Sequence, residues 1–178
     1  MLDLIDFSRP GALTRVDASV KVGKSALLWG SVSAFAFRGG PVLTLDGKGR
    51  ITVPARHRDV LMATANGQMV IAKNPDGCLS LFPLPVWEQF EAELLKLPLD
   101  QEGWRRLYVG SATDVEIDGA SRVLVPPELR TWAGLEREVK FMGVGANFEL
   151  WDSARYDARE TALIAAGRPE VLRNLVIR

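Results

Sequence analysis

The sequence predicts an α+β protein, mainly β, in which two copies of one small unit form an internal pseudo-twofold repeat. One observation is that the ten residues Leu45–Pro54 recur, with the same order of residue types, as Ile117–Pro126. The other is that a short helical pattern and two more apolar runs follow each copy, so the chain repeats at a spacing of about 70 residues. Four short strands make a poor sheet alone, so we expect the two copies to complete one small barrel.

The repeated stretch begins with a turn. It reads Leu-Asp-Gly-Lys-Gly-Arg-Ile-Thr-Val-Pro in the first copy and Ile-Asp-Gly-Ala-Ser-Arg-Val-Leu-Val-Pro in the second. Asp-Gly between β-branched runs predicts a hairpin in which the Gly after Asp takes a positive φ. The aspartate should accept backbone N–H groups of the turn. The residues expected to structure the two turns are Asp46, Gly47, Gly49, Asp118 and Gly119.

After each turn, the period of two separates inward from outward side chains. The inward positions are Ile51, Val53, Val123 and Val125. Thr52 is outward, and Leu124 replaces it in the second copy, which suggests that part of the outward face is covered. A buried hairpin explains the Asp, Gly, Val and Pro residues of the repeat. It does not explain Arg50 and Arg122, which keep the same outward position and are expected to point to solvent without supporting the core.

The predicted organisation has five parts. They are an extension over residues 1–36, the first repeat over 37–86, connecting helices over 87–111, the second repeat over 112–155 and a helical tail over 156–178. Strands are expected at Met69–Ala72 and Cys78–Phe82, between turn residues. Apolar residues at helical spacing predict an amphipathic helix over Pro85–Leu97. In the second copy, Arg130 occupies the position of Arg58 after the repeated proline.

The extension over residues 1–36 differs from the rest of the chain. Its apolar end is weakly like a signal peptide, but the leading part is long and contains three aspartates. We therefore expect an unstructured extension, or a translation start placed too far upstream. Gly23-Lys24-Ser25 is not a phosphate-binding loop, because that motif needs Gly at position 18 and the residue there is Ala.

Composition excludes several classes of site. Lys and Arg number 22, as do Asp and Glu, so no global basic field indicates nucleic acid or membrane, and a binding site must be local. One Cys and one His make a structural zinc site or a His-based catalytic triad improbable, so no metal and no cofactor are expected. Cys78 is expected to be a buried structural thiol. The chain contains no apolar run long enough for a transmembrane helix.

The repeat and its flanking phrases resemble the MraZ family of bacterial regulators. The resemblance rests on the two Asp-x-x-x-Arg turns and on the phrases at Phe37–Gly39, Leu81–Trp87 and Phe148–Asp152, and it extends from Phe37 to about Gly167. It implies a tandem AbrB-like double-psi or swapped-hairpin barrel with flanking helices, assembled into a ring-shaped homo-oligomer.

The same resemblance implies a function. It is that of a cytoplasmic, nucleoid-associated repressor that binds short direct repeats of double-stranded DNA in the promoter of its own division and cell-wall gene cluster. The family's DNA-contacting basic residues fall on Lys48, Arg50 and Arg122. Ser121 departs from the glycine usual in the family, and a side chain there has a steric cost if φ is positive. We therefore expect the second turn to contribute less to DNA binding than the first.

The sequence is less consistent with two other classes of function. An antitoxin-like interaction module is the alternative, because swapped-hairpin barrels also carry peptide-binding tails, but this tail is short and one chain already holds both hairpins. Enzymatic activity is not expected. Asp46 and Asp118 could be imagined as a catalytic carboxylate pair, but each is better explained as the first residue of a turn, and no set of nucleophile, base and orienting residue is apparent.

Overall fold

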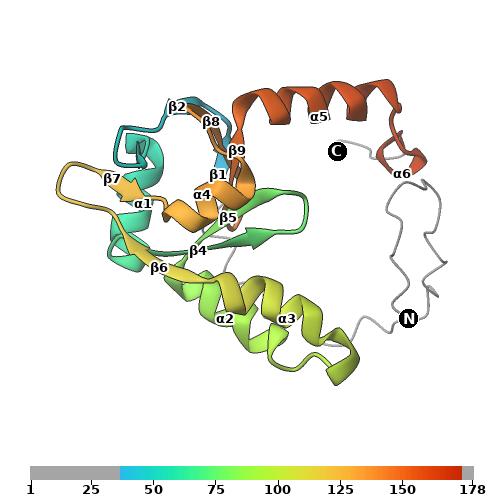
Figure 1. Cartoon of the computed structure of the whole chain (residues 1–178), viewed down its shortest axis with the longest axis horizontal. Helices are drawn as coiled ribbons and strands as arrows, with labels where there is room; N and C mark the ends of the chain where they lie inside the picture. The colour runs from blue at the N-terminus through green and yellow to red at the C-terminus, as the bar shows by residue number, and fades with distance from the viewer. Residues whose placement is uncertain (1–36, 174–178) are drawn as a thin grey trace. The chain divides into compact units, whose positions relative to one another are not determined.

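The computed structural model describes residues 37–173 (Figure 1), so the expectations for residues 1–36 and for the last five residues lie outside the described part. The first copy contains β1 (Phe37–Gly39), β2 (Val42–Thr44), β3 (Arg50–Thr52), α1 (Ala55–Ala65), β4 (Gln68–Asn74) and β5 (Cys78–Pro83). The second contains β6 (Thr113–Glu116), β7 (Arg122–Leu124), α4 (Pro127–Ala133), β8 (Glu138–Gly145) and β9 (Phe148–Asp152). Between them lie α2 (Leu84–Leu94) and α3 (Glu102–Tyr108), and α5 (Ser153–Ala165) and α6 (Glu170–Arg173) follow β9.

The strands form a seven-stranded sheet and a separate two-stranded ribbon. The sheet order is β1-β8-β9-β5-β4-β6, with β2 also paired to β8, and the ribbon is β3-β7. All seven strand pairings are antiparallel, and five of them join one copy to the other. The pairing of β2 with β8 corresponds to that of β6 with β4, as a pseudo-twofold axis between the copies requires.

This topology corrects the predicted hairpin, and the described strands do not close into a barrel. The strands on either side of each Asp-Gly turn do not form a ladder with each other: β2 pairs with β8 and β6 with β4, whereas β3 and β7 pair together. Within the described residues the large sheet is open, because β6 ends it at one side and β1 and β2 at the other. The architecture is mixed α and β with antiparallel sheets, rather than mainly β.

The core is shared by the two copies. The four predicted inward residues, Ile51, Val53, Val123 and Val125, are all at most 2% exposed, which confirms that part of the pattern. They belong to one cluster with residues of the large sheet, including the stacked pair Phe141 and Phe148. Cys78 is also fully buried, as expected, and burial raises the pKa of its thiol. Neither copy could close this core alone, because each supplies only part of its wall.

A second, smaller cluster lies on the other side of β4 and β5. Val70, Ala72 and Phe82 of these strands contact Trp87 of α2, and Phe90 and Tyr108 pack against them. Phe82 and Phe90 are stacked with ring centroids 5.3 Å apart. The predicted amphipathic helix is therefore confirmed as α2, with its apolar side on the sheet, and Figure 1 shows α2 and α3 side by side below β4.

His57, the single histidine of the chain, lies among aromatic rings at the start of α1. It is 5% exposed, and its ring centroid is 5.1 Å from that of Phe148 and 5.7 Å from that of Phe37. Its Nε2 accepts a hydrogen bond from Arg56 Nε at 3.1 Å. Burial, and then the charge of Arg56, lower the pKa of the imidazole below its usual 6.5, so the folded chain favours neutral His57.

We expect the free energy of unfolding to fall as the pH is lowered below about 6.5. In that range the unfolded chain binds a proton at His57 more readily than the folded chain does, so acidification favours unfolding. Urea denaturation at about pH 7.5 and about pH 5.5 measures the effect, with the non-titrating variant His57→Gln as control. If the wild-type chain is equally stable at both pH values, or if the variant shows the same pH dependence, the effect does not come from His57.

Candidate functional site

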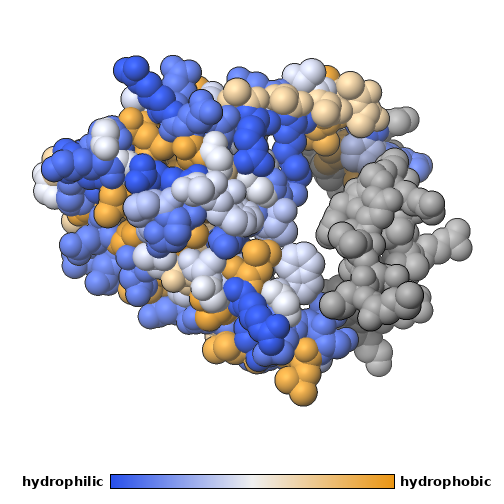
Figure 2. All heavy atoms as spheres, viewed as in Figure 1, coloured by the Kyte–Doolittle hydropathy of each residue, from blue (hydrophilic) through white to orange (hydrophobic). Residues whose placement is uncertain are grey.

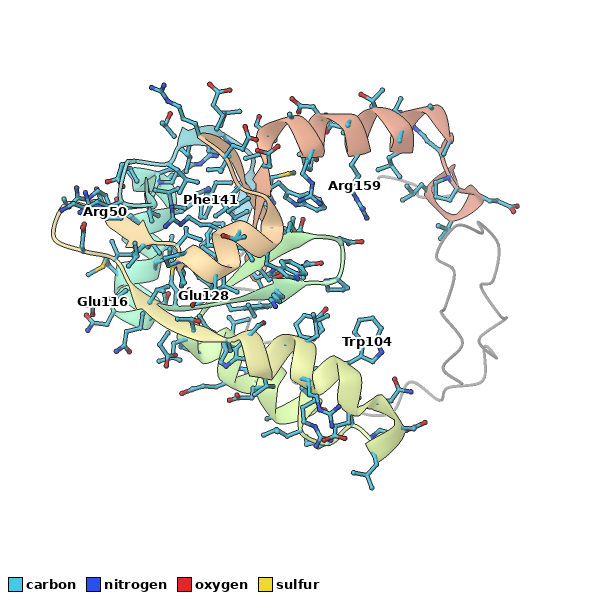
Figure 3. The ribbon with its side chains drawn as sticks, viewed as in Figure 1. Arg50, Trp104, Glu116, Glu128, Phe141 and Arg159 are labelled. Carbon is cyan, nitrogen blue, oxygen red and sulfur yellow. The ribbon has the colours of Figure 1, made fainter. Side chains whose placement is uncertain are left out.

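The β3–β7 ribbon has one buried and one exposed face. The register pairs Arg50 with Leu124, Ile51 with Val123, and Thr52 with Arg122. We call the exposed side, formed by Arg50, Thr52, Arg122 and Leu124, the outer ribbon face. Its two arginines lie diagonally across the strand pair, and Thr52 and the 48% exposed Leu124 occupy the other two corners. The ribbon thus brings together Arg50, which is labelled in Figure 3, and Arg122, which is far from it in the sequence.

Each ribbon strand is entered through the same turn. Gly49 N donates to Asp46 O at 2.8 Å and Asp46 N donates to Arg50 O at 2.9 Å, and both bonds recur in the second copy, at Ser121, Asp118 and Arg122. A positive φ occurs at Gly49 (79°) and at Ser121 (64°), not at Gly47 or Gly119. The expectation for the glycine after Asp was therefore wrong, because this turn places its left-handed residue directly before the arginine.

The carboxylate of each turn aspartate holds the arginine that follows. Asp46 Oδ1 accepts hydrogen bonds from the backbone N–H of Lys48 and of Arg50, at 2.9 and 3.0 Å. Its Oδ2 accepts from Arg50 Nε at 2.7 Å and from Nη2 at 2.6 Å. Asp118 makes the same four contacts with Ala120 and Arg122. The hydrogen bond from the arginine side chain is the main reason that the pKa of each aspartate lies below its usual value.

These contacts change the expectation for the two arginines. They were expected to point to solvent and support nothing, but their side chains are only 25% exposed for Arg50 and 32% for Arg122. Each guanidinium is fixed against its turn by two nitrogens, which limits the conformations available to it. The carboxylates of Asp46 and Asp118 are each paired with their own arginine, so the structure gives no support to a catalytic carboxylate pair.

A second arginine reaches each turn from the opposite copy. Arg58 of α1 donates from Nη1 to Ser121 Oγ at 3.0 Å. Arg130 of α4 lies over Gly49, where an added Cβ would overlap its guanidinium. The hydroxyl of Ser121 thus accepts a hydrogen bond that the glycine of the first copy cannot. The alignment of the two repeats pairs Arg58 with Arg130, but it does not indicate that each arginine reaches the turn of the other copy.

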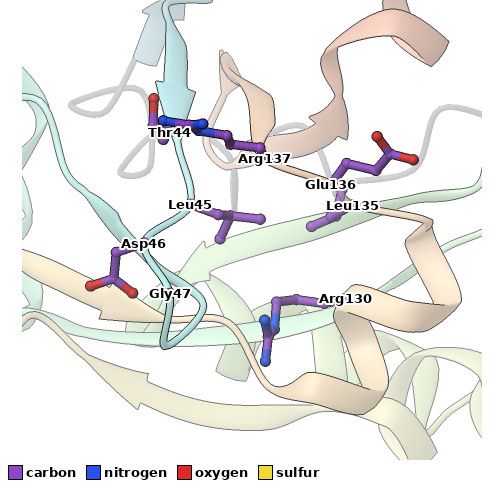
Figure 4. A pocket seen from close by; sticks show the side chains of 8 residues that line it. All are labelled: Thr44, Leu45, Asp46, Gly47, Arg130, Leu135, Glu136 and Arg137. Carbon is purple, nitrogen blue, oxygen red and sulfur yellow. The ribbon is translucent and has the colours of Figure 1, made fainter.

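The two turns differ in charge. Lys48 lies exposed at the tip of the first turn, and Ala120 occupies the equivalent position in the second. A cavity of about 590 Å³ adjoins the first turn (Figure 4). It lies between Thr44–Gly47 and the segment after α4, and Arg130 and Arg137 line it. Arg137 was not noticed in the sequence, since nothing in its local pattern distinguishes it from a solvated arginine.

Residues 37–173 contain neither a metal-binding cluster nor a membrane-spanning helix. No group of three or more His, Cys, Asp or Glu side chains in this part of the chain is arranged to hold a metal ion. No helix there is both long and apolar enough to cross a membrane. The side chains gathered at the ribbon are cationic, hydroxyl-bearing and apolar, a combination that suits recognition of an anionic polymer rather than metal chemistry.

Comparison with known proteins gives one consistent result. The family model described as "MraZ protein, putative antitoxin-like" matches residues 36–109 and again residues 108–176. A transcriptional regulator MraZ of Burkholderia cenocepacia is 53% identical over 138 residues, which cover 78% of this chain and 97% of that protein. The proteins of the same name from Burkholderia vietnamiensis and Burkholderia multivorans show the same identity and coverage.

We expect Gly49→Ala to lower the free energy of unfolding by about 1 to 3 kcal/mol. Alanine is strained at a positive φ, and its Cβ would displace Arg130. Gly47→Ala is the matched control: its φ is not positive and an added Cβ meets nothing within 4 Å, so it should cost less than about 0.5 kcal/mol. Urea denaturation measures both, and equal effects of the two substitutions would contradict this account of the turn.

Proposed function

The chain belongs to the MraZ family, and from this we propose that it is a transcriptional regulator that binds double-stranded DNA through the outer ribbon face. The observation that carries the proposal is the pair of arginines, Arg50 and Arg122, held by aspartates on one exposed two-stranded ribbon. The relatives' name supports regulation of transcription. The proposed role is one of binding, and we assign no enzymatic activity to it.

A two-stranded antiparallel ribbon fits the major groove, where base edges differ in their hydrogen-bond donors and acceptors. The contacts of Arg50 and Arg122 with their aspartates use Nε and Nη2, which leaves Nη1 outside each ion pair. A guanidinium fixed in this way loses little conformational entropy when it meets a guanine edge or a phosphate. Lys48, exposed beside Arg50, is suited to a phosphate contact.

Leu124 adds an apolar group to the same face. It is 48% exposed and lies directly opposite Arg50 in the ribbon. A leucine side chain in the major groove can contact the C5-methyl group of thymine, a marker of that base. The expectation that part of the outward face is covered then has a natural explanation: DNA covers it in the complex.

We further propose that the chain is a repressor acting on short direct repeats in the promoter of its own division and cell-wall gene cluster, in the cytoplasm at the nucleoid. One protomer offers few contacts, and the chain has no net charge. A ring-shaped homo-oligomer would present the same face many times to repeated DNA boxes. Weak contacts would then add through effective concentration.

The end of the chain supports self-association. No residue of α5 is buried, and four large apolar side chains of α5 and α6 are at least 51% exposed: Leu163, Ile164, Val171 and Leu172. Figure 2 shows apolar atoms on the exposed side of α5. Exposed apolar surface of this kind marks sites of association between proteins. The same surface is the one observation that favours the second candidate, an antitoxin-like module whose tail binds another protein.

For the DNA interface, we expect Arg50→Ala to weaken binding to the upstream DNA of the gene by about tenfold or more, since every protomer loses a contact. Arg122→Ala should cost less, because Lys48 has no counterpart in the second turn. The lost ion pair is partly exposed, so Tm should fall by no more than about 3 °C.

A mobility-shift titration measures these affinities, with scrambled DNA as competitor. Arg106→Ala, which removes an exposed arginine of α3 away from the ribbon, is the control for charge and should bind like wild type. If Arg50→Ala binds DNA as the wild type does, or if it does not fold, the role of Arg50 is structural.

For the assembly, we expect light scattering at micromolar concentration to give a mass well above twice the 19.6 kDa of one chain. Leu163→Glu should reduce this mass, because it places a charge on the exposed apolar surface. Ala158→Glu, at an exposed position of the same helix, should leave it unchanged. If the wild-type protein is a stable monomer, weak contacts cannot add through effective concentration.

A further inference from the structure

The cavity beside the first turn has the features of an anion site. Its volume is about 590 Å³, and Leu45 and Leu135 lie between its two arginines, Arg130 and Arg137 (Figure 4). Leu45 N donates a hydrogen bond to Arg137 O at 2.9 Å, which fixes the backbone of Arg137 against the turn. The Arg137 side chain is exposed and forms no ion pair with any residue between 37 and 173.

Arg130 supplies a buried donor without an acceptor. Its Nε is one of two buried side-chain nitrogen or oxygen atoms in residues 37–173 that have no hydrogen-bond partner. A buried donor left unsatisfied costs free energy, and donors attached to charged groups cost more. The guanidinium lies against Gly49, where an added Cβ would overlap it. An acceptor in the cavity would attract the guanidinium, and a small rotation of the Arg130 side chain would give Nε a partner.

The two carboxylates at the cavity do not neutralise these arginines. Asp46 has both oxygens occupied by Arg50 and by backbone N–H groups of its own turn. Glu136 is exposed, and Figure 4 shows its carboxylate directed away from the turn. The Arg130 side chain, in contrast, extends toward the turn. The free charge lining the cavity is therefore positive, which favours a small anion.

The second copy has no such site, although the fold repeats. There the counterpart of Arg130 is Arg58, whose guanidinium donates to Ser121 Oγ and to Asp59. The bond from Leu45 N to Arg137 O recurs as one from Ile117 N to Gly67 O, so a glycine stands in place of Arg137. The unpaired donor and the additional arginine thus occur together at one turn only. This coincidence separates the cavity from features that the duplicated fold produces twice.

We propose that Arg130 and Arg137 form a phosphate subsite, filled by a backbone phosphate of the DNA whose bases the outer ribbon face contacts. The inference rests on the proposed function. It adds a contact from the second copy, because Arg130 and Arg137 belong to that copy but lie beside the first turn. A phosphate oxygen would accept from the guanidinium of Arg130, and Arg137 would pair with the same group from the rim. Such a contact fixes the position of the protein on the duplex without reading its sequence.

The test measures the affinity of Arg137→Ala for the upstream DNA and for scrambled DNA over a range of salt concentrations. Affinity should fall about five- to tenfold on both DNAs, with the ratio between them unchanged, and the slope of log K against log salt should become shallower by about 1 for each engaged protomer. Arg130→Lys, which keeps the charge but removes the Nε donor, should weaken binding in the same sequence-independent way. Arg106→Ala removes the same charge elsewhere and should leave the slope unchanged.

The results distinguish failure of the phosphate subsite from failure of the proposed function. If wild type binds the DNA and Arg137→Ala has the same affinity and slope, the subsite is wrong while the proposed function stands. A loss confined to the upstream DNA would also overturn it, since a phosphate contact cannot depend on sequence. If wild type binds no DNA, the proposed function itself fails. Inorganic phosphate that shifts the Arg130 Nε–H resonance in that case would assign the cavity to free phosphate instead.

Discussion

The structure depends on the pairing of β3 with β7, because this is where one copy completes the other. Ile51 and Val123 face each other across the ribbon and are both almost fully buried. If the ribbon were broken, the core shared by the two copies would lose the cover that Ile51 and Val123 give it. Burial of a side chain of this size contributes about 1.5 to 3 kcal/mol, so a few such positions are comparable to the total stability of a domain. The same pairing sets the outer ribbon face, since the side chains that alternate with the buried ones form it.

The Asp-Arg pairs are the second constraint, and they link the turn to the proposed recognition. An aspartate that accepts two backbone N–H groups fixes the turn, and the same carboxylate fixes the arginine four residues later. One residue type thus performs both tasks in each copy. The arginine side chain loses its conformational entropy during folding rather than on binding, which favours affinity for a rigid partner such as duplex DNA.

Duplication also allowed the copies to diverge where the core does not constrain them. The inward residues of the two ribbon strands are all Ile or Val, whereas Thr52, Lys48 and Gly49 correspond to Leu124, Ala120 and Ser121. Ser121 occupies a left-handed conformation and receives a hydrogen bond from Arg58 that offsets part of the strain. The first turn has the more cationic surroundings, including the cavity of Arg130 and Arg137. We infer that the two turns contribute unequally to binding.

The sequence by itself determined the repeat, the buried set at Ile51, Val53, Val123 and Val125, the amphipathic helix α2 and the buried thiol of Cys78. These follow from local periodicity and composition, which one strand or helix expresses alone. Only the tertiary structure decided that the strands flanking each turn pair with the other copy, that the large sheet stays open, and that Arg58 and Arg130 cross to opposite turns. The ion pairs of Arg50 and Arg122 and the cavity at Arg137 also escaped prediction. All of these depend on contacts between residues far apart in the chain, and a pattern read along one segment does not specify its partner.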